Sequence, residues 1–280
     1  MSNKGISLKK NFLTCENYIP FNEKNILENF FNIAYILKIP LLVADNLSIQ
    51  KRDKLLQNLE IKDFRVTTSD NFYEKLKSKN LIFHQLKIAY KDHLFSNDIF
   101  QSLLVSRKTI NENSIEEIKQ KLPNLRNQYE IISLYSDNQN ILKWAAQDSR
   151  IDYITIEILE NSSFIDRALC SITKQNNKPF EIVLSPLITV QYEKKLSEIL
   201  RKGKKLLQLF ISTNAPFIFT MKPKIPFNLR TGSQMRLLGE LLGSSYNRTK
   251  ISVFDKQLDI LIGNTIRLDE SYVVEGLKEV

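Results

Sequence analysis

The feature that most constrains the fold is a regular alternation between short apolar runs rich in β-branched residues and longer amphipathic stretches. The short runs predict buried strands, and the amphipathic stretches, with apolar residues three and four positions apart, predict helices. The alternation recurs from about residue 40 to residue 220. Strands that alternate with helices of ten or more residues indicate βαβ units and a parallel sheet.

Length and repetition favour a closed sheet over an open one. The chain has 280 residues, 42% of them hydrophobic, with 7 Gly and 8 Pro, which is enough apolar material for one large core. About seven or eight βα units without an evident linker favour a single-domain α/β fold, a TIM-barrel-like (β/α) barrel. No G-x-G-x-x-G loop supports a dinucleotide-binding sheet, since Gly239 and Gly243 lie within a helical pattern.

The expected elements cover most of the chain. The predicted strands are Phe12–Cys15, Pro40–Ala44, Ile61–Thr67, Ser102–Thr109, Glu130–Tyr135, Ile151–Ile158, Phe180–Leu184 and Pro216–Thr220. The predicted helices are Asn22–Leu37, one from Ser48, one from Ser114, Gln139–Gln147, Phe164–Thr173, Thr189–Ser212, Gly232–Leu242 and Asp255–Ile262. Residues 70–100 have mixed periodicity, which predicts an insertion with its own helix or hairpin.

The sequence carries no sign of export or membrane insertion. Residues 1–10 are polar and basic without a following apolar segment, and residues 33–44 are interrupted by Lys38 and Pro40. Cys15 and Cys170 lack metal-site or disulfide spacing and are expected to be reduced thiols. We therefore expect a soluble, cytoplasmic protein that makes no contact with a membrane.

The positive charge of the chain is concentrated in one segment. Residues 191–236 contain ten Lys and Arg but two Glu, and so account for +8 of the formal net charge of +9. No acidic residue stands between Glu198 and Glu240. This asymmetry is compatible with an anionic partner such as nucleic acid.

The first part of this segment predicts a helix with one cationic side. At 100° per residue, Lys194, Arg201 and Lys205 fall within about 40° of one another, flanked by Lys204, while the apolar residues occupy the opposite side. Gly203 lies in the middle of the apolar side and predicts close packing against the sheet. A solvated face without a partner and a membrane-surface helix have similar patterns.

The second part predicts a cationic loop after the strand that ends at Thr220. Lys222, Lys224 and Arg230 stand in this loop, Arg236 follows in the next helix, and two prolines stiffen the chain. Thr231 or Ser233 is expected to cap the helix, whose N-terminal N–H groups suit phosphate oxygens. A solvent-exposed loop with incidental lysines is the alternative.

Residues for catalysis or metal binding are few. His84 and His93 are nine positions apart and would lie on opposite sides of a helix, and neither belongs to a zinc motif. Asp148, Asp152 and Glu157 flank one predicted strand and leave open a carboxylate site for magnesium. An ion pair of Asp148 with Arg150 is the simpler interpretation. Ser185 lacks the G-x-S-x-G context of a nucleophile.

Several segments are similar to those of a known family. They are "VSRKTINENSIEEIKQKLPNLRNQYEIISLYS", "ILKWAAQDSRIDYITI", "FEIVLSPLI", "KKLLQLFISTNAPFIFT" and "FNLRTGSQMRLLGELLG", followed by Asn264. In this order, they resemble ribonuclease P protein component 3, the thirty-kilodalton subunit of archaea and eukaryotes. Two features depart from that pattern: Thr220-Met221 stands where a Ser-Gly pair is common, and residues 70–100 have no counterpart.

The resemblance implies a barrel related to the polymerase and histidinol phosphatase family. It further implies a non-catalytic subunit that binds and stabilises the catalytic ribonuclease P RNA for 5′-leader removal from precursor tRNA. The implied partners are this RNA, protein component 2, the other ribonuclease P proteins and precursor tRNA. The resemblance also implies that the RNA-based reaction needs Mg²⁺ and that the protein itself binds no cofactor.

The candidate RNA-binding residues are eight cations: Lys194, Arg201, Lys204, Lys205, Lys222, Lys224, Arg230 and Arg236. Two other functions remain open at this point. One is a metal-dependent barrel phosphoesterase that uses carboxylates, and the other is an interaction protein whose apolar helix surfaces meet a partner. No catalytic or metal-binding residue is assigned.

Overall fold

The structure, a computed structural model, describes residues 15–20, 24–58, 65–77, 79, 81–95, 101–269, 272–274 and 277–278. Its centre is a sheet of eight parallel strands. They are β1 (Cys15–Pro20), β2 (Leu41–Asp45), β3 (Arg65–Thr68), β4 (Gln101–Ile110), β5 (Ile131–Leu134), β6 (Tyr153–Ile156), β7 (Phe180–Val183) and β8 (Phe217–Thr220). Two short strands, β9 (Tyr272–Val274) and β10 (Leu277–Lys278), form a separate antiparallel pair.

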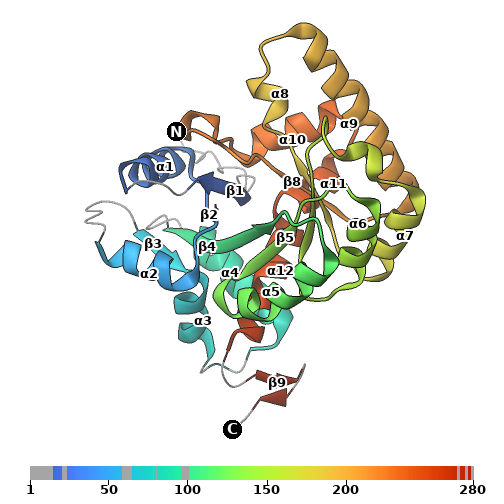
Figure 1. The fold of residues 1–280 in the computed structure, drawn as a ribbon. Coiled ribbons are helices and arrows are strands. Elements are labelled where there is room, and N and C mark those ends of the chain that lie inside the picture. The colour runs from blue at the N-terminus through green and yellow to red at the C-terminus, as the bar shows by residue number, and fades with distance from the viewer. Residues whose placement is uncertain are drawn as a thin grey trace, which may run out of the picture.

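The strand order is β1-β2-β4-β5-β6-β7-β8, with β3 beside the first half of β4. The two ends of this path approach each other, because Cα atoms of β1 and β8 come within 8 Å. No backbone ladder joins these two strands in the part of the chain that the structure describes. The parallel strands and the curled sheet confirm the TIM-barrel-like α/β prediction (Figure 1).

Helices follow most of the strands. They are α1 (Lys24–Leu37), α2 (Ile49–Asn58), α3 (Ser69–Lys77), α4 (Phe83–Phe95), α5 (Ile115–Gln128), α6 (Gln139–Gln147), α7 (Arg167–Gln175), α8 (Pro186–Thr189), α9 (Glu193–Thr213), α10 (Gly232–Leu241), α11 (Tyr246–Lys250) and α12 (Lys256–Arg267). Short turns are η1 (Ser162–Phe164), η2 (Pro226–Asn228) and the π-type turn η3 (Ile251–Asp255).

Alternate strand residues serve two apolar layers, as the period of two in a strand requires. On one face, Ile132, Ile154 and Ile182 pack with residues of α5, α6, α7 and α9. On the other face, Ile131 and Tyr153 pack with residues of α3, α4 and α12. A third cluster joins α1 to the outer residues of β2. The sheet is thus covered on both faces, as expected for parallel strands.

The predicted elements agree closely with the observed ones, with some differences. Helix α6 has the predicted bounds, and residues 70–100 contain α3 and α4, which lie against α12. The predicted helix Thr189–Ser212 is wrong in its continuity, because extended backbone at Val190 and Tyr192 separates α8 from α9. Of the predicted strand Phe12–Cys15, residues 12–14 lie outside the described residues.

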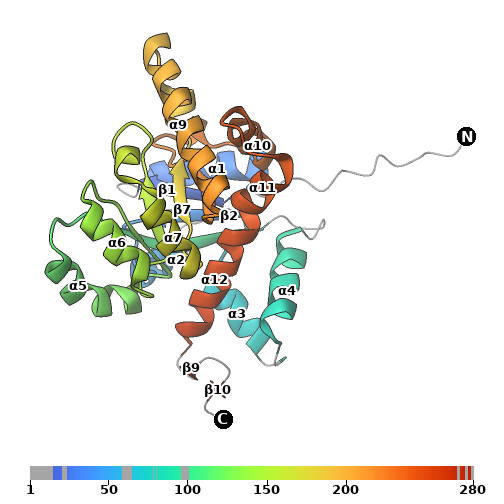
Figure 2. The ribbon, with the colours of Figure 1, turned by 90° about the vertical axis from the view of Figure 1, so that its right-hand side faces the viewer.

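Helix α9 is much longer than the strands beside it. Its 21 residues span about 31 Å, whereas the 4 residues of β8 span about 13 Å. The helix therefore overhangs the sheet, and Figures 1 and 2 both show one end of α9 projecting beyond the rest of the molecule, with α8 beside it in Figure 1. The overhang lies at the carboxyl end of the strands, because α8 follows the end of β7.

Candidate nucleic-acid interface

Helix α9 carries an exposed cationic side. Lys194, Arg201, Lys204 and Lys205 are all exposed, and no described acidic residue forms an ion pair with any of them. Lys202 differs, because its Nζ lies 2.9 Å from Oε1 of Glu198 one turn earlier. Glu198 also interacts electrostatically with Arg201 and with the exposed Lys195, and these cations contribute to the lowering of its pKa after Lys202. The helix thus presents more exposed cations than carboxylates, an arrangement that suits phosphate groups.

The opposite side of α9 fixes the helix to the body of the protein. Ile199, Leu207 and Phe210 are fully buried in the outer core layer. Gly203 is buried as well, and a Cβ atom at this position would lie 2.8 Å from Cδ2 of Leu242 and 3.4 Å from Cδ1 of Ile158. The predicted close approach is therefore present, against the residue after α10 and the segment after β6. Because the apolar side is buried in the core, it is not available to a membrane.

The loop from Met221 to Arg230 lies at the same carboxyl end of the sheet, directly after β8. Lys224 is exposed, but Lys222 forms an ion pair with Glu157, which follows β6. Lys222 also has a φ of 50°, an uncommon conformation for a residue with a side chain. The ion pair of Lys222 therefore links the loop after β8 to the segment after β6. This link was not predicted from the sequence.

The two remaining predicted cations also have partners within the protein. Arg230 donates through Nη1 to the carbonyl oxygens of Phe227 and Leu229, both at 2.7 Å. Arg236 lies 2.8 Å from Glu240 and places its guanidinium 4.9 Å from the ring centre of Tyr246. The structure therefore brings four of the eight candidates together on α9 and distributes the others over the adjoining loop and α10.

The start of α10 confirms one predicted cap. Thr231 accepts a hydrogen bond from the backbone N of Gln234, and the Gln234 side chain accepts from the backbone N of Thr231. This reciprocal capping box satisfies two N–H groups of the helix N-terminus. Fewer donors are left for a phosphate than the sequence suggested.

A buried polar network fills the inner face of the sheet toward the carboxyl ends of the strands. Arg107 of β4 donates to both carboxylate oxygens of Glu181 of β7, at 2.7 and 2.6 Å. It also donates to Ser133 of β5 and Thr155 of β6. Arg107 and Glu181 are fully buried. The ion pair and these hydrogen bonds therefore join four adjacent strands, β4 to β7. The network lies toward the end of the barrel where enzymes of this architecture place their active sites.

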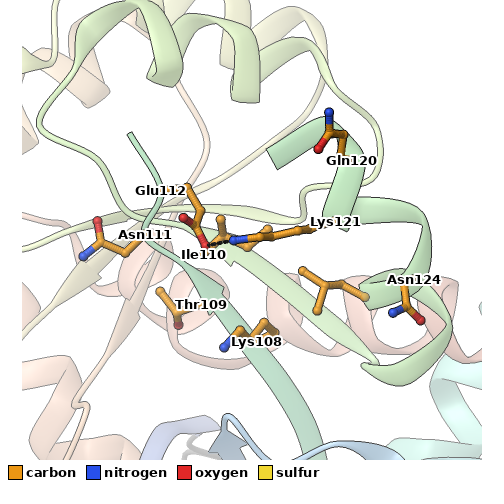
Figure 3. A pocket seen from close by; sticks show the side chains of 9 residues that line it. Lys108, Thr109, Ile110, Asn111, Glu112, Gln120, Lys121 and Asn124 are labelled. Carbon is orange, nitrogen blue, oxygen red and sulfur yellow. Dashed lines mark hydrogen bonds and ion pairs between the residues drawn. The ribbon is translucent and has the colours of Figure 1, made fainter. Parts of the chain in front are cut away.

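A pocket of about 540 Å³ lies between the end of β4 and helix α5 (Figure 3). Lys121 donates to Glu112 across it at 2.6 Å, and this pair lowers the pKa of Glu112. The remaining polar groups of its lining are amides, a hydroxyl and Lys108. The two opposite charges already satisfy each other, so the pocket lacks the converging ionisable groups of a catalytic site.

The comparisons with known proteins settle the family. The model of a family described as RNase P subunit p30 matches residues 35–267. The chain belongs to the RNase P subunit p30 family. It is therefore a ribonuclease P subunit, part of an endoribonuclease complex. The resemblance that was noted in the sequence is confirmed. A search of curated protein sequences gave no match.

Solved structures support the same fold. A chain from the cryo-EM structure of archaeal Ribonuclease P with mature tRNA matches with a TM-score of 0.63 and 14% identity, covering 95% of this chain and 97% of that chain. A prolidase in complex with N-methylphosphonate-L-proline matches with a TM-score of 0.50 and 10% identity, covering 96% and 77%. An A. niger ochratoxinase matches with a TM-score of 0.50 and 10% identity, covering 89% and 71%.

Possible metal ligands of this RNase P subunit p30 family member are scattered over the part of the chain that the structure describes. No group of three or more His, Cys, Asp or Glu side chains converges among the described residues. His84 is exposed on α4, and His93 stacks on Phe72 with ring centres 4.0 Å apart. The relation to the polymerase and histidinol phosphatase family, which would supply such a site, stays a prediction.

The proposed carboxylate set is separated in space. Asp148 pairs with Arg150 at 2.6 Å, as the simpler interpretation predicted. Asp152 accepts from both terminal nitrogens of Arg126, at 2.7 and 3.0 Å. Both aspartates precede β6, whereas Glu157 follows it. The hypothesis of a magnesium site built from these three residues therefore has no support.

Asp148 and Asp152, in the segment "DSRIDYITI", instead accept hydrogen bonds at the amino end of the sheet. Arg126 of α5 links Asp152 to Asn264 of α12, whose Oδ1 lies 2.8 Å from Nη2 of Arg126. Lys178 is also buried at this end and donates to the carbonyl oxygens of Ala145 and Asp148. Burial lowers the pKa of Lys178 to about 8. These residues connect strands and helices at the end opposite the cationic loop.

No described helix is long and apolar enough to cross a lipid bilayer. Cys170 is a free, buried thiol, as expected, and burial raises its pKa to about 11. The side chain of Cys15 lies outside the described side chains.

Proposed function

We propose that the protein is a non-catalytic subunit of ribonuclease P that binds and stabilises the catalytic RNA for 5′-leader removal from precursor tRNA. The observation that carries this proposal is the exposed cationic side of α9, where Lys194, Arg201, Lys204 and Lys205 form no ion pair with a described acidic residue, in a member of the RNase P subunit p30 family. An exposed row of cations on a rigid, core-anchored helix is suited to a polyanion because the backbone is already ordered, so that only side-chain conformations are lost on binding.

The proposed RNA contacts fall into two groups. Lys194, Arg201, Lys204 and Lys205 contact backbone phosphates directly through the outer side of α9. The loop and α10 contribute Lys224, Arg230 and Arg236, while Lys222 acts mainly by fixing the loop through Glu157. Phosphate contacts of this kind orient a protein on RNA without reading its sequence.

The rest of the assembly follows from the family. The proposed partners are ribonuclease P RNA, protein component 2 and the other ribonuclease P proteins, with precursor tRNA as the substrate of the complete enzyme. We further propose that Mg²⁺ serves the RNA-based reaction, that the polypeptide binds no cofactor, and that the complex works in the cytoplasm.

Reconstitution tests this function. The catalytic RNA and the remaining protein subunits are assembled with and without this chain, and the rate of precursor-tRNA cleavage is measured at fixed Mg²⁺. We expect cleavage to increase when the chain is added, and a Glu substitution at Lys194, Arg201 and Lys205 together to remove most of the increase. Cleavage that does not depend on the chain would contradict the proposal, as would hydrolysis of a phosphoester by the chain alone.

A further inference from the structure

The loop between β8 and α10 exposes an aromatic side chain that the core does not use. Phe227, in the turn η2, is 77% exposed, whereas Met221 and Leu229 on either side of it are 0% and 2% exposed. Leu229 packs in the cluster that includes Phe30 and Phe31 of α1. The two ends of the loop are therefore anchored in the protein, and the ring of Phe227 is left in solvent.

Hydrogen bonds hold this part of the loop in one conformation. The backbone N atoms of Asn228 and Leu229 donate to the carbonyl oxygens of Ile225 and Pro226, each at 3.0 Å. Arg230 donates to the carbonyl oxygens of Phe227 and Leu229, which places its guanidinium beside the turn. The exposed ring thus sits on a fixed backbone, so little entropy is lost when a ligand covers it.

The surroundings of the ring are cationic. Lys224 is exposed three residues before Phe227, and Arg230 lies three residues after it. The nearest acidic residues in the sequence are Glu198 and Glu240. Glu157 does reach this loop from another strand, but it pairs with Lys222, five residues before Phe227. An exposed aromatic ring between cations combines the two features by which proteins hold unpaired nucleotides: a stacking surface for the base and a charge for the phosphate.

We propose that Phe227 stacks on the base of an unpaired RNA nucleotide while Lys224 and Arg230 contact the adjacent phosphates. This inference rests on the proposed RNA-binding function and deepens it, because it assigns a single-stranded contact to the loop that is distinct from the phosphate contacts of α9. An apolar protein surface could also cover the ring, but it would offer no anionic group to the exposed Lys224.

Two substitutions at Phe227 separate stacking from apolar burial. Phe227→Tyr retains an aromatic ring, whereas Phe227→Leu retains apolar character but loses the ring. Because the side chain is exposed, neither change should affect folding. Phe83→Leu is the matched control, since Phe83 is 44% exposed on α4, a helix that packs against α12 and β4, whereas the turn η2 packs against α1. Binding of the full-length variants to an oligoadenylate single strand and to a blunt RNA duplex is measured by fluorescence anisotropy.

We expect Phe227→Leu to weaken single-strand binding by about 5- to 100-fold, the equivalent of one stacked base. Duplex binding should change little, and Phe227→Tyr and Phe83→Leu should bind both probes like the unaltered protein. An oligonucleotide with 2-aminopurine in place of adenine should show fluorescence quenching that Phe227→Leu removes.

The possible failures are distinguishable. If the unaltered protein binds both RNA probes and Phe227→Leu binds them equally well, the stacking contact is wrong and the proposed function stands. If the unaltered protein binds neither, both are wrong. If Phe227→Leu retains RNA binding but loses a ribonuclease P protein from the reconstituted complex, the ring belongs to a protein interface and the inference is overturned.

Discussion

Removal of the charge of Glu181 should destabilise the protein severely. Its carboxylate receives two hydrogen bonds from Arg107 and one from Thr155, at 2.7 Å, with both charged side chains fully buried. Glu181→Gln keeps the size of the side chain but removes the carboxylate that lies 2.6 Å from the guanidinium, and the carboxylate of Asp45 is farther away, at 3.9 Å. Breaking a buried pair in this way costs about 3–5 kcal/mol, a large share of a total stability of about 5–15 kcal/mol.

The assay is urea unfolding followed by circular dichroism. Glu112→Gln is the matched control, because it breaks a pair of the same length, 2.6 Å, between Glu112 and Lys121, whose side chain is 52% exposed. The control should leave the unfolding midpoint almost unchanged, since exposed ion pairs contribute little. A double substitution of Arg107 and Glu181 by Met should cost less than the sum of the single changes, because it leaves neither charge alone.

The reasoning would be refuted if Glu181→Gln shifted the midpoint no more than Glu112→Gln. That result would mean that Arg107 is hydrated in solution, and that the inner face of the sheet at this end is accessible to water. A buried pair, by contrast, fills the inner face of the sheet between β4 and β7 and excludes water from it.

Three further predictions concern other parts of the fold. Gly239→Ala should destabilise the protein by about 1–3 kcal/mol in thermal unfolding, because the added Cβ would lie 2.8 Å from the buried ring of Phe219; equal stability would contradict this packing. Between pH 7 and pH 10, the free energy of unfolding of the unaltered protein should rise by about 2.5 kcal/mol relative to that of Lys178→Met, because the folded chain releases the Lys178 proton near pH 8 and the unfolded chain near pH 10.4. Parallel pH profiles of the two proteins in urea unfolding would contradict this. In a Cys15→Ser variant, Cys170 should react with thiol reagents only as fast as the protein opens, and rapid labelling under native conditions would refute its burial.

The parts of the fold with strong local patterns could be predicted from the sequence. The apolar side of α9, with Ile199, Gly203 and Phe210, was predicted from its 3.6-residue period and is buried as expected. The sequence also offered Thr231 or Ser233 as the cap of α10, and the structure has Thr231 in this position. A helix face and a helix cap depend on residues that are close in the sequence, so they can be predicted from one sequence without an alignment.

Features that depend on distant partners were missed. Arg107 and Glu181 are 74 positions apart, and nothing local indicates that they meet. The available signal was that each of two predicted buried strands contains a charged residue. Because an unpaired buried charge is costly, such residues are expected to pair with an opposite charge. Likewise, Lys222 was assigned to RNA because no acid stands near it in the sequence, yet Glu157 reaches it from the end of another strand. The break before α9 has no comparably clear signal.

The central claim is that the outer side of α9 binds RNA phosphates. The most direct test measures the affinity of full-length protein for ribonuclease P RNA as a function of salt concentration. Lys194, Arg201 and Lys205 are replaced together by Gln, and the control replaces Lys54, Lys75 and Lys119, exposed lysines of α2, α3 and α5 far from α9 (Figure 1). The account predicts that the α9 variant loses about two to three units of the log–log salt slope while the control keeps the slope of the unaltered protein. Equal slopes for the two variants would contradict it.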